Sequence, residues 1–324
     1  MLVKWWKGQD LNLCTPKRAD LQSAAINHSA TLPQQEICVR QQKGFSFLCQ
    51  VCDVYSMKKD YQKGGKPPKK DFSEYKAQAK KQKVNMWGTH AVREAWLNPA
   101  RSIKSFYVLE QALKNFEDTM KAAQDAGLTR PEPKIVDRYT LDNWLGEDVV
   151  HQGLAIDAEP LEEFFVQDMV SRVRNAERSV FVILDQVTDP HNIGAIMRSA
   201  SAFGAHGIIM QNRHAPEITG TLAKTACGAV DHIPVAYETN LGRAVTYLQE
   251  HGYQTIGLDE RAEKTLSEIT LPAKAVLILG AEGKGMRPHL REQCDYLVRL
   301  PTQGAILSLN VSNAAAVALY ALCA

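Results

Sequence analysis

The spacing of apolar residues changes character part-way along the chain. Between residues 86 and 158, apolar side chains recur at the three- and four-residue intervals of a helix face, as at Ala91, Val92, Ala95 and Trp96. Short apolar runs lie between these segments, and the mixture predicts a small unit of alternating helices and strands. Its expected helices cover 86–99, 113–126 and 141–145, and its expected strands cover 105–109, 134–136 and 150–156.

From Ser179 onward the apolar runs are continuous and lack polar alternation. Strands of this kind are buried on both faces, which is typical of a parallel sheet covered by helices. We therefore predict an α/β fold for residues 179–324, joined to the smaller α/β unit at 86–158 by an amphipathic linker at 159–178. The expected strands are 180–184, 207–210, 254–258, 275–279 and 296–300, and the expected helices are 193–203, 241–250 and 311–322.

The N-terminal part of the chain fits neither pattern. Residues 1–56 show no sustained period, and part of this segment resembles a transfer-RNA gene translated in a wrong strand or frame. We hypothesise that 1–56 is a spurious or disordered extension and that Met57 is the true start. A zinc site at Cys38, Cys49 and Cys52 is the alternative, but the second ligand pair of a zinc ribbon is missing.

Charge is concentrated in one segment. The chain of 324 residues carries a net charge of only +2, yet residues 57–84 hold ten lysines against three acids, so the segment is +7 and the remainder is −5. With few apolar residues, it cannot bury a core, and we interpret 57–85 as a flexible basic tail. Such a tail suits a polyanion such as RNA, and a merely solubilising role is the alternative.

Composition narrows the class of protein. The chain is 45% hydrophobic and 23% charged, which is ordinary for a globular protein of about two domains. Its longest apolar stretches, such as 314–324, fall short of the roughly 18 residues that a membrane span needs, and its start lacks a signal-peptide core. Seven scattered cysteines do not form a disulfide framework. We expect a cytoplasmic protein with no membrane partner.

The first of three loops that carry candidate chemistry runs from Asp185 to Arg198. A buried strand ends here in a polar loop, and Asn192 is expected to cap the helix that follows. The apolar stripe of that helix leaves Arg198 on a different face, near the loop. A capping asparagine and a surface arginine are the plainer interpretation of this loop alone.

The second loop follows the strand at 275–279. Gly280, Gly283 and Gly285 allow the backbone to approach a ligand closely, but the spacing is neither a dinucleotide fingerprint nor a phosphate-binding loop. Glu282 would repel a phosphate. A ligand with an adenosine moiety, a positive centre and no phosphate would tolerate that carboxylate, and S-adenosylmethionine fits this description. A glycine-rich turn with a solvated glutamate is the alternative.

The third loop covers residues 300–312, where a strand ends at a proline. Ser308, Asn310 and Ser312 gather at the start of the last helix and present hydroxyl and amide groups beside free backbone N–H groups. One capping residue would satisfy the helix. Three polar residues at alternate positions therefore indicate a site.

Together, these three loops resemble the SpoU (TrmH-type) branch of the SPOUT RNA methyltransferases over nearly all of residues 179–324. The family's three motifs are matched by 192–198, by 280–283, and by 300–301 with 308–312. Residues 88–92 and 150–153 look like the ends of the family's small substrate-binding domain. The chain from 86 to 324 is most similar to the two-domain bacterial enzymes that methylate a guanosine 2′-oxygen in 23S ribosomal RNA.

The resemblance implies a trefoil-knotted SPOUT domain, a homodimer that completes the active site, S-adenosylmethionine as methyl donor, no metal, and ribosomal RNA as partner. It also implies catalytic roles for five residues: Arg198 would meet the RNA, while Asn192, Glu282, Ser308 and Asn310 would form a polar shell around the target ribose. The cofactor-binding residues that it implies are Gly280, Ala281, Gly283, Leu300, Pro301, Leu309 and Ser312.

Other functions stay open at this point. A transfer-RNA ribose methyltransferase or a resistance-type ribosomal enzyme would share the same motifs. A noncatalytic RNA-binding or ribosome-assembly protein could keep the fold, but it need not keep Asn192, Arg198, Glu282 and Asn310 together. A Rossmann dehydrogenase is disfavoured because the glycine fingerprint and its acidic ribose-binding residue are missing.

Overall fold

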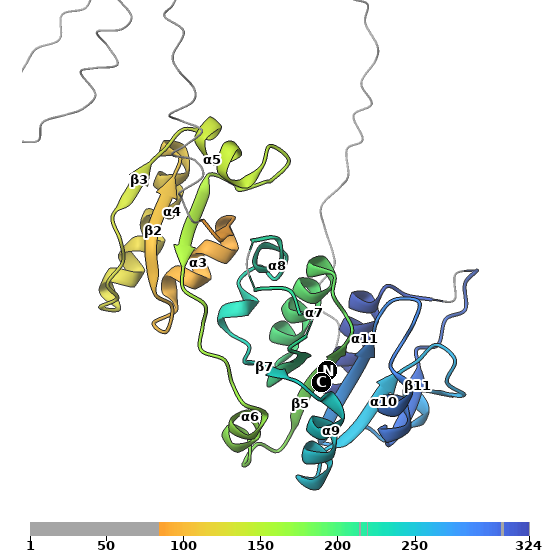
Figure 1. Cartoon of the computed structure of the whole chain (residues 1–324). Coiled ribbons are helices and arrows are strands. Elements are labelled where there is room, and N and C mark those ends of the chain that lie inside the picture. The colour runs from red at the N-terminus through yellow and green to blue at the C-terminus, as the bar shows by residue number, and fades with distance from the viewer. Residues whose placement is uncertain (1–83, 214, 219, 306–307, 324) are drawn as a thin grey trace, which may run out of the picture. The chain divides into compact units, whose positions relative to one another are not determined.

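The computed structural model describes residues 84–213, 215–218, 220–305 and 308–323. The predicted extension 1–56 and all but the last two residues of the predicted tail 57–85 lie outside this range. The described chain forms two sheets, one of four strands and one of seven (Figure 1). Both sheets were expected from the sequence, and the larger one is parallel throughout, as predicted.

The four-stranded sheet has the order β1-β4-β2-β3 and mixes antiparallel with parallel pairs. Its core is aromatic, because the Trp96, Phe106 and Phe116 rings lie with centroids 4.8–5.7 Å apart. The elements of this unit are β1 (Met86–Trp87), α3 (Thr89–Leu97), β2 (Ile103–Val108), α4 (Glu110–Asp125), β3 (Pro133–Ile135), α5 (Arg138–Leu145) and β4 (Leu154–Ala158).

The predicted strand 150–156 is wrong in its first half. Gln152 and Gly153 have φ angles of 56° and 81°, which lie outside strand geometry, and the Gly153 N–H donates to His151 Nδ1 at 3.0 Å. β4 therefore begins only at Leu154. The predicted helix 86–99 is also shorter than expected, because Met86 and Trp87 pair with β4 as a strand.

The seven-stranded sheet has the order β7-β6-β5-β10-β8-β11-β9. The chain moves from β5 outward to β7 on one side and then crosses to build the other side, so neighbouring β5 and β10 flank the point where the strand order reverses. Its strands are β5 (Ser179–Asp185), β6 (Gly207–Gln211), β7 (Val235–Glu238), β8 (Gln254–Leu258), β9 (Lys264–Thr265), β10 (Lys274–Gly280) and β11 (Tyr296–Arg299).

Helices cover both faces of this sheet, as its apolar strands require. The α7 and α11 helices contribute to one buried cluster and the α6, α9 and α10 helices to another. The helices and 3₁₀ turns are α6 (Val166–Arg172), α7 (Pro190–Phe203), α8 (Gly220–Thr225), η2 (Ala229–Asp231), α9 (Leu241–Glu250), η3 (Leu266–Glu268), α10 (Pro288–Gln293) and α11 (Val311–Cys323). The expected linker thus contains α6, whose Val166 and Met169 side chains are buried.

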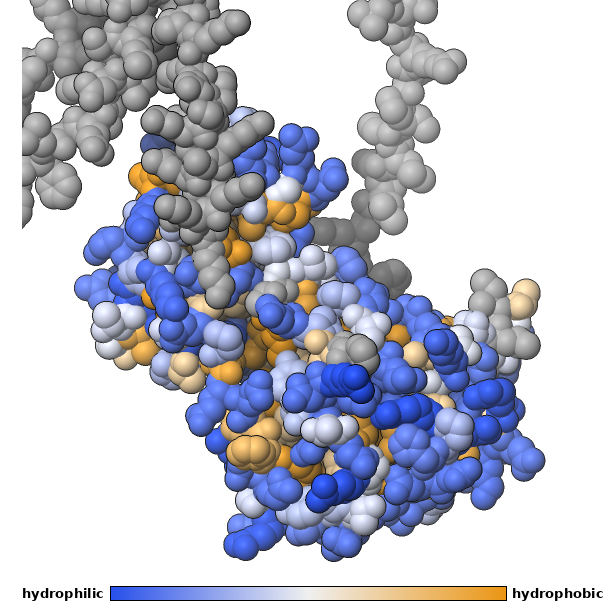
Figure 2. Space-filling model, viewed as in Figure 1, coloured by the Kyte–Doolittle hydropathy of each residue, from blue (hydrophilic) through white to orange (hydrophobic). Residues whose placement is uncertain are grey.

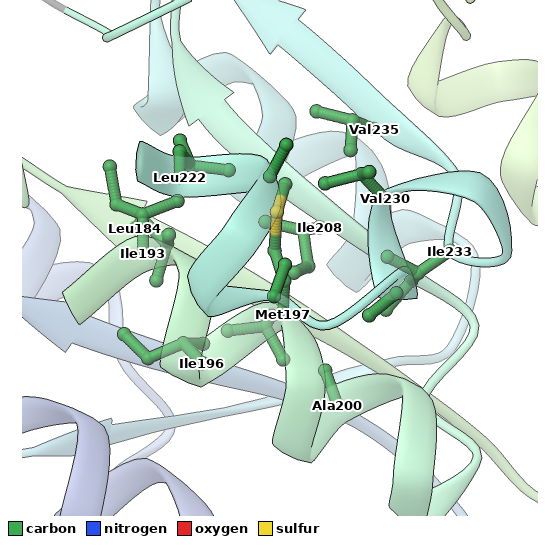
Figure 3. Packing of buried hydrophobic residues seen from close by; sticks show 14 of the residues in the cluster. Leu184, Ile193, Ile196, Met197, Ala200, Ile208, Leu222, Val230, Ile233 and Val235 are labelled. Carbon is green, nitrogen blue, oxygen red and sulfur yellow. The ribbon is translucent and has the colours of Figure 1, made fainter. Parts of the chain in front are cut away.

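The α7 helix is held tightly by its neighbours. Its apolar side chains, among them Ile193 and Met197, pack with residues of β6, α8, η2 and β7, such as Leu222 (Figure 3). A side-chain carbon at Gly194 would lie only 2.8 Å from the Leu222 carbonyl oxygen, so the backbones of α7 and α8 approach as closely as glycine allows. This packing fixes the position of the helix that carries the first motif.

One capping prediction needs correction. Asp189, not Asn192, caps α7, because its carboxylate accepts the N–H groups of His191 and Asn192 at 3.1 and 3.3 Å. Pro190 occupies the first helical position, which needs no N–H donor. The Asn192 side chain is therefore free for another role inside the first turn of the helix.

On the face shown in Figure 2, hydrophilic residues predominate and hydrophobic residues form smaller patches. Among the described residues, no helix is both long and apolar enough to cross a membrane.

A buried ion pair ties η2 to the four-stranded sheet's unit. Arg101 Nε lies 2.9 Å from Asp231 Oδ1, with side chains 4% and 0% exposed, and Asn98 Nδ2 donates to the same oxygen at 3.0 Å. Arg101 Nη1 also donates to the Glu159 carbonyl oxygen at 2.9 Å. Each charge is thus compensated inside the protein, and loss of either partner leaves the other charge buried alone.

We predict that Arg101→Met lowers the free energy of unfolding by about 3–5 kcal/mol, because the Asp231 carboxylate loses its cation in a buried place. Thermal and denaturant unfolding would measure the change. The matched control is Lys104→Met, which removes the exposed ion pair between Lys104 and Glu159, whose side chains are 57% and 48% exposed. That control should leave stability nearly unchanged. Equal effects of the two substitutions would contradict the prediction.

Candidate active site

The candidate site lies at the carboxyl ends of β5 and β10. These neighbouring parallel strands pair in a register that sets Asp185 opposite Gly280, the last residue of each strand. The first predicted loop leaves the sheet at Asp185 and the second at Gly280, so both emerge side by side. This is the place where open α/β sheets bind ligands, since the strand order reverses here.

Three predicted residues from three segments meet at this edge. Asn192 Nδ2 donates to Glu282 Oε1 at 3.1 Å, and Asn310 Nδ2 donates to the same oxygen at 2.6 Å and to Asn192 Oδ1 at 2.9 Å. Asn192 is 9% exposed, whereas Glu282 and Asn310 are exposed. We call Asn192, Glu282 and Asn310 the amide–carboxylate cluster.

The direction of every hydrogen bond in the cluster follows from one backbone group. The Ser312 N–H, in the first turn of α11, donates to Asn310 Oδ1 at 2.8 Å, and the Ser312 hydroxyl donates to the same oxygen. Asn310 Oδ1 is therefore an acceptor, and its Nδ2 must face the other two residues. Because a carboxylate only accepts, Asn192 must in turn point its Nδ2 at Glu282. Asn310 thus caps α11 and holds the cluster at once.

The loop after β10 folds back on its own strand. A side-chain carbon at Gly280 would collide with the backbone of Gly285 and Met286, so the missing side chain makes room for the loop itself. The Gly285 N–H donates to the Ala281 carbonyl oxygen at 2.8 Å and closes a tight turn around Glu282. At Gly283 the backbone has a φ of 74°, and a side chain there would meet open space.

An ion pair that the sequence did not reveal anchors this loop. The Asp185 side chain is fully buried. Its carboxylate accepts hydrogen bonds from the backbone N–H of Arg287 at 2.8 Å and from Arg287 Nε at 2.7 Å. The ion pair joins the end of β5 to the far end of the loop that carries Glu282. An acidic residue at a buried strand end and an arginine shortly after the glycines were the available signals, but 102 residues separate them.

Among the described residues, Arg198 forms no hydrogen bond with the amide–carboxylate cluster. Its guanidinium is exposed, and Nη1 donates to Cys227 Sγ at 3.4 Å. Cys227 has a φ of 51°, which is rare for a residue with a side chain and indicates that the surrounding structure imposes it. Cys227 is half-buried, and its sulfur is the partner of the predicted catalytic arginine.

The remaining predicted residues are distributed around the same edge. Ser308 is exposed, and none of the described residues forms a hydrogen bond with it to join it to the cluster. Leu309 is 46% exposed, whereas Leu300 packs against the main apolar cluster. Pro301 directly follows Leu300 and is exposed. Within the described residues, no group of three or more His, Cys, Asp or Glu side chains is arranged to hold a metal ion.

Family models match both units of the chain. The model described as the SpoU rRNA Methylase family matches residues 179–320, and the model described as RNA 2′-O ribose methyltransferase substrate binding matches residues 86–164. Relatives that are 34% and 40% identical to this chain cover 72% of it. The chain belongs to the SpoU rRNA methylase family. The family predicted from the three loops is therefore confirmed, and with it the RNA 2′-O-methyltransferase class of enzyme.

Several relatives of this SpoU protein are similar over most of their length. The 23S rRNA (guanosine-2′-O-)-methyltransferase RlmB of Pseudomonas aeruginosa is 40% identical over 238 residues, which cover 72% of this chain and 94% of the relative. RlmB of Photorhabdus laumondii is 34% identical, with 72% and 95% covered. The putative TrmH family tRNA/rRNA methyltransferase YacO of Bacillus subtilis is 35% identical, with 72% and 92% covered.

Solved structures support the same fold. The SpoU methyltransferase AviRb from Streptomyces viridochromogenes, in complex with AdoMet, matches with a TM-score of 0.60 at 22% identity and covers 74% of this chain and 88% of its own. An AdoMet-bound rRNA methyltransferase from Sinorhizobium meliloti matches with a TM-score of 0.59 at 23% identity, with 73% and 85% covered. The SPOUT-type α/β fold is thus confirmed, while its knot stays a prediction.

We predict that Gly280→Ala weakens binding of S-adenosylmethionine, because the loop around Glu282 must refold to make room for the new carbon. Overpacking of this kind costs about 1–3 kcal/mol, which corresponds to a roughly 5- to 150-fold loss of affinity. Isothermal titration calorimetry would measure it. Gly252→Asn is the matched control, since asparagine tolerates a positive φ, the space around Gly252 is open, and this residue lies outside the predicted cofactor-binding set. If both variants bind equally well, Gly280 does not shape the loop.

Proposed function

We propose that this protein transfers the methyl group of S-adenosylmethionine to the ribose 2′-oxygen of a guanosine in 23S ribosomal RNA. The observation that carries this proposal is the amide–carboxylate cluster, which joins the three family motifs in one place at the β5–β10 edge. The relatives named RlmB, with 33–40% identity, support the choice of RNA and nucleotide. We expect the enzyme to work in the cytoplasm, without a metal.

The residues at the edge fit the proposed methyl donor. Leu309 offers a half-exposed apolar side chain, and the backbone of the β10 loop is open at Gly283. Gly280, Ala281, Gly283, Leu300, Pro301, Leu309 and Ser312 would hold the cofactor through backbone groups and apolar contacts. When bound, S-adenosylmethionine supplies a methyl group on a sulfonium that the ribose oxygen can attack. The Glu282 carboxylate is compatible with that positive centre.

The cluster would orient the ribose. Glu282 Oε1 accepts hydrogen bonds from the side-chain amides of Asn192 and Asn310, whereas none of the described residues donates to Oε2. The free oxygen can accept a hydrogen bond from the 2′-hydroxyl and would take up its proton as the ribose oxygen gains the methyl group and the sulfonium becomes a neutral thioether, while Ser308 and the asparagine amides line the approach. Most of the rate would come from this positioning, since alignment of two reactants can lower a barrier by about 7–11 kcal/mol.

Arg198 would act on the RNA electrostatically. A guanidinium stays protonated in proteins, so it cannot serve as an effective base. It can stabilise the developing negative charge on the ribose oxygen or align a neighbouring phosphate. Cys227 Sγ, 3.4 Å from Nη1, would restrict the directions in which the fork points.

We predict that Arg198→Ala abolishes methyl transfer while leaving the affinity for S-adenosylmethionine unchanged. Loss of one preorganised donor to a developing oxyanion costs about 10²- to 10³-fold in rate. Single-turnover assays with labelled cofactor would measure the rate, and calorimetry would measure binding. Arg198→Lys keeps the charge but loses the planar fork, so we expect partial activity. Full activity of Arg198→Ala would show that the assigned role is wrong.

We also propose that two copies of the chain form a dimer that completes the site. Within one chain, Arg198 contacts Cys227 rather than the cluster. The surface where α7 and α11 pack together exposes Phe203, Val317 and Tyr320, which are 37%, 51% and 63% exposed, and the Phe203 and Tyr320 rings lie 5.8 Å apart. We call these three residues the α7–α11 patch. Large apolar side chains gathered in this way are typical of an interface.

If the α7–α11 patch is the dimer interface, Tyr320→Glu should convert the protein from dimer to monomer and remove methyl transfer. Sedimentation velocity would give the mass, and transfer would be assayed at the same concentration. Tyr139→Glu serves as control, because Tyr139 is 60% exposed on α5, away from the patch. A fully active monomer would contradict the proposal.

Each segment that the sequence predicts would have its own role in this function. Residues 86–158 would bind the RNA, 159–178 would connect the two units, and 179–324 would hold the catalytic centre. The basic segment 57–85 would add nonspecific RNA affinity through counterion release. The segment 1–56 would contribute nothing to either activity.

Methyl transfer from labelled S-adenosylmethionine to total RNA from cells lacking the protein tests the proposed function, followed by mapping of 2′-O-methylated positions. A single labelled guanosine in 23S ribosomal RNA is expected. A transfer-RNA site would keep the chemistry and change the substrate. Absence of transfer to both naked RNA and preribosomal particles would contradict the proposal and favour a noncatalytic RNA-binding role.

A further inference from the structure

A cavity of about 430 Å³ lies beside the β10 loop. Its apolar lining comes from Met286, Pro288 and Leu297. Met286 and Leu297 belong to the apolar cluster that α9 and α10 cover, whereas the helices that carry Asn192 and follow Asn310 pack on the other cluster. The described lining includes none of the three residues of the amide–carboxylate cluster, and the volume is typical of a pocket for a small organic group.

Three cationic side chains surround the apolar lining: Arg261, Lys284 and Arg291. Glu292 is the one acidic residue among the described lining residues. Lys284 is exposed, and none of the described residues forms an ion pair with it. The cavity thus offers an apolar surface with cationic groups at its border.

The two arginines are oriented by one buried carboxylate. Asp259, 6% exposed, accepts Arg261 Nε at 2.9 Å and Arg261 Nη2 at 3.1 Å, and its Oδ2 lies 3.1 Å from Arg291 Nε. Burial would raise the pKa of Asp259, but the hydrogen bonds and nearby charge of the arginines outweigh it and lower that pKa. The carboxylate therefore stays ionised at neutral pH and shares a single negative charge between two guanidinium groups.

One polar group in this arrangement lacks a partner. The N–H at Arg291 Nε is buried, and despite its closeness to Asp259 none of the described residues accepts a hydrogen bond from it. The Arg291 side chain as a whole is 37% exposed and the Arg261 side chain is 58% exposed, so the capacity to bind a ligand lies in their outer guanidinium groups. Together with the unpaired Lys284 ammonium, this favours a ligand that carries both an anionic group and a flat apolar part.

We propose that this cavity binds a nucleotide of the RNA substrate that flanks the methylated one. The base would lie on the Met286 and Leu297 side chains, against a guanidinium plane, while Lys284 would pair with the phosphate. Lys284 follows Glu282 in the same turn, and its N–H donates to the Glu282 carbonyl oxygen at 2.9 Å. A strand whose ribose lies at Glu282 therefore passes close to Lys284.

This assignment rests on the proposed function, because it takes an RNA strand as the substrate of the nearby site. The cavity then supplies the cationic groups that the amide–carboxylate cluster lacks. Neutral amides and one carboxylate orient a ribose but do not attract a polyanion, whereas the cationic border holds the adjoining backbone. Removal of its cations should weaken RNA binding without changing the chemical step.

The test compares RNA binding by the full chain and its Lys284→Gln variant, with in vitro transcribed 23S ribosomal RNA over a range of salt concentrations. We expect weaker binding, a slope of log affinity against log salt that falls by about one unit, and a raised KM for RNA with unchanged kcat. Arg291→Gln in addition to Lys284→Gln should lower the affinity further. Arg243→Gln, an exposed cation on α9, is the matched control and should leave both quantities unchanged.

Two results would overturn the assignment. If Lys284→Gln affects RNA binding and its salt slope no more than Arg243→Gln, the cavity does not hold RNA. If the variant instead raises the dissociation constant for S-adenosylmethionine, the cavity serves the cofactor. Both measurements are equilibrium titrations that need no turnover, so a wild-type protein without methyl-transfer activity would refute the proposed function while leaving the cavity test decisive.

Discussion

The pairing of β5 with β10 is the constraint on which the rest of the site depends. With Asp185 opposite Gly280, two loops that are far apart in sequence leave the sheet at the same level. Asp185 then accepts Arg287 from the far end of the second loop, and Gly280 leaves room for that loop to fold back. A shift of one residue in this register would turn Asp185 to the other side and separate the loop from its anchor.

In the amide–carboxylate cluster, too, one residue has two structural roles. Asn310 caps α11 through its oxygen and joins Asn192 and Glu282 through its nitrogen, so the start of the last helix and the position of the carboxylate are linked. Asp189 takes over the capping of α7 and leaves Asn192 free to bond Glu282. Polar residues that each serve local structure thus combine into one site. The hydrogen bonds among them hold the side chains in place even though Glu282 and Asn310 are exposed.

The fold was predictable because its signals are local. Continuous apolar runs located β5, β6, β8, β10 and β11, and helical spacing located α3, α4, α7, α9 and α11. The short strand β7 and the helices α8 and α10 were missed, because four to six residues carry too little periodicity to stand out. The turn at Gln152 and Gly153 depends on positive φ angles, which apolar spacing does not report.

The candidate site was predictable in its residues but not in its connections. Motif resemblance singled out Asn192, Glu282 and Asn310, and the structure brings those three together. The roles of Asp185 and Cys227 could not be predicted, since each depends on a partner 102 or 29 residues away that only the folded chain brings near.

A double-mutant cycle on Glu282→Ala and Asn310→Ala tests the central claim most directly, with single-turnover methyl transfer to RNA as the measurement. If the two side chains act as one unit, the double variant should lose little more activity than either single variant, because the first substitution already dismantles the cluster. Losses that multiply, as they do for independent sites, would contradict the claim that the three loops assemble one catalytic unit.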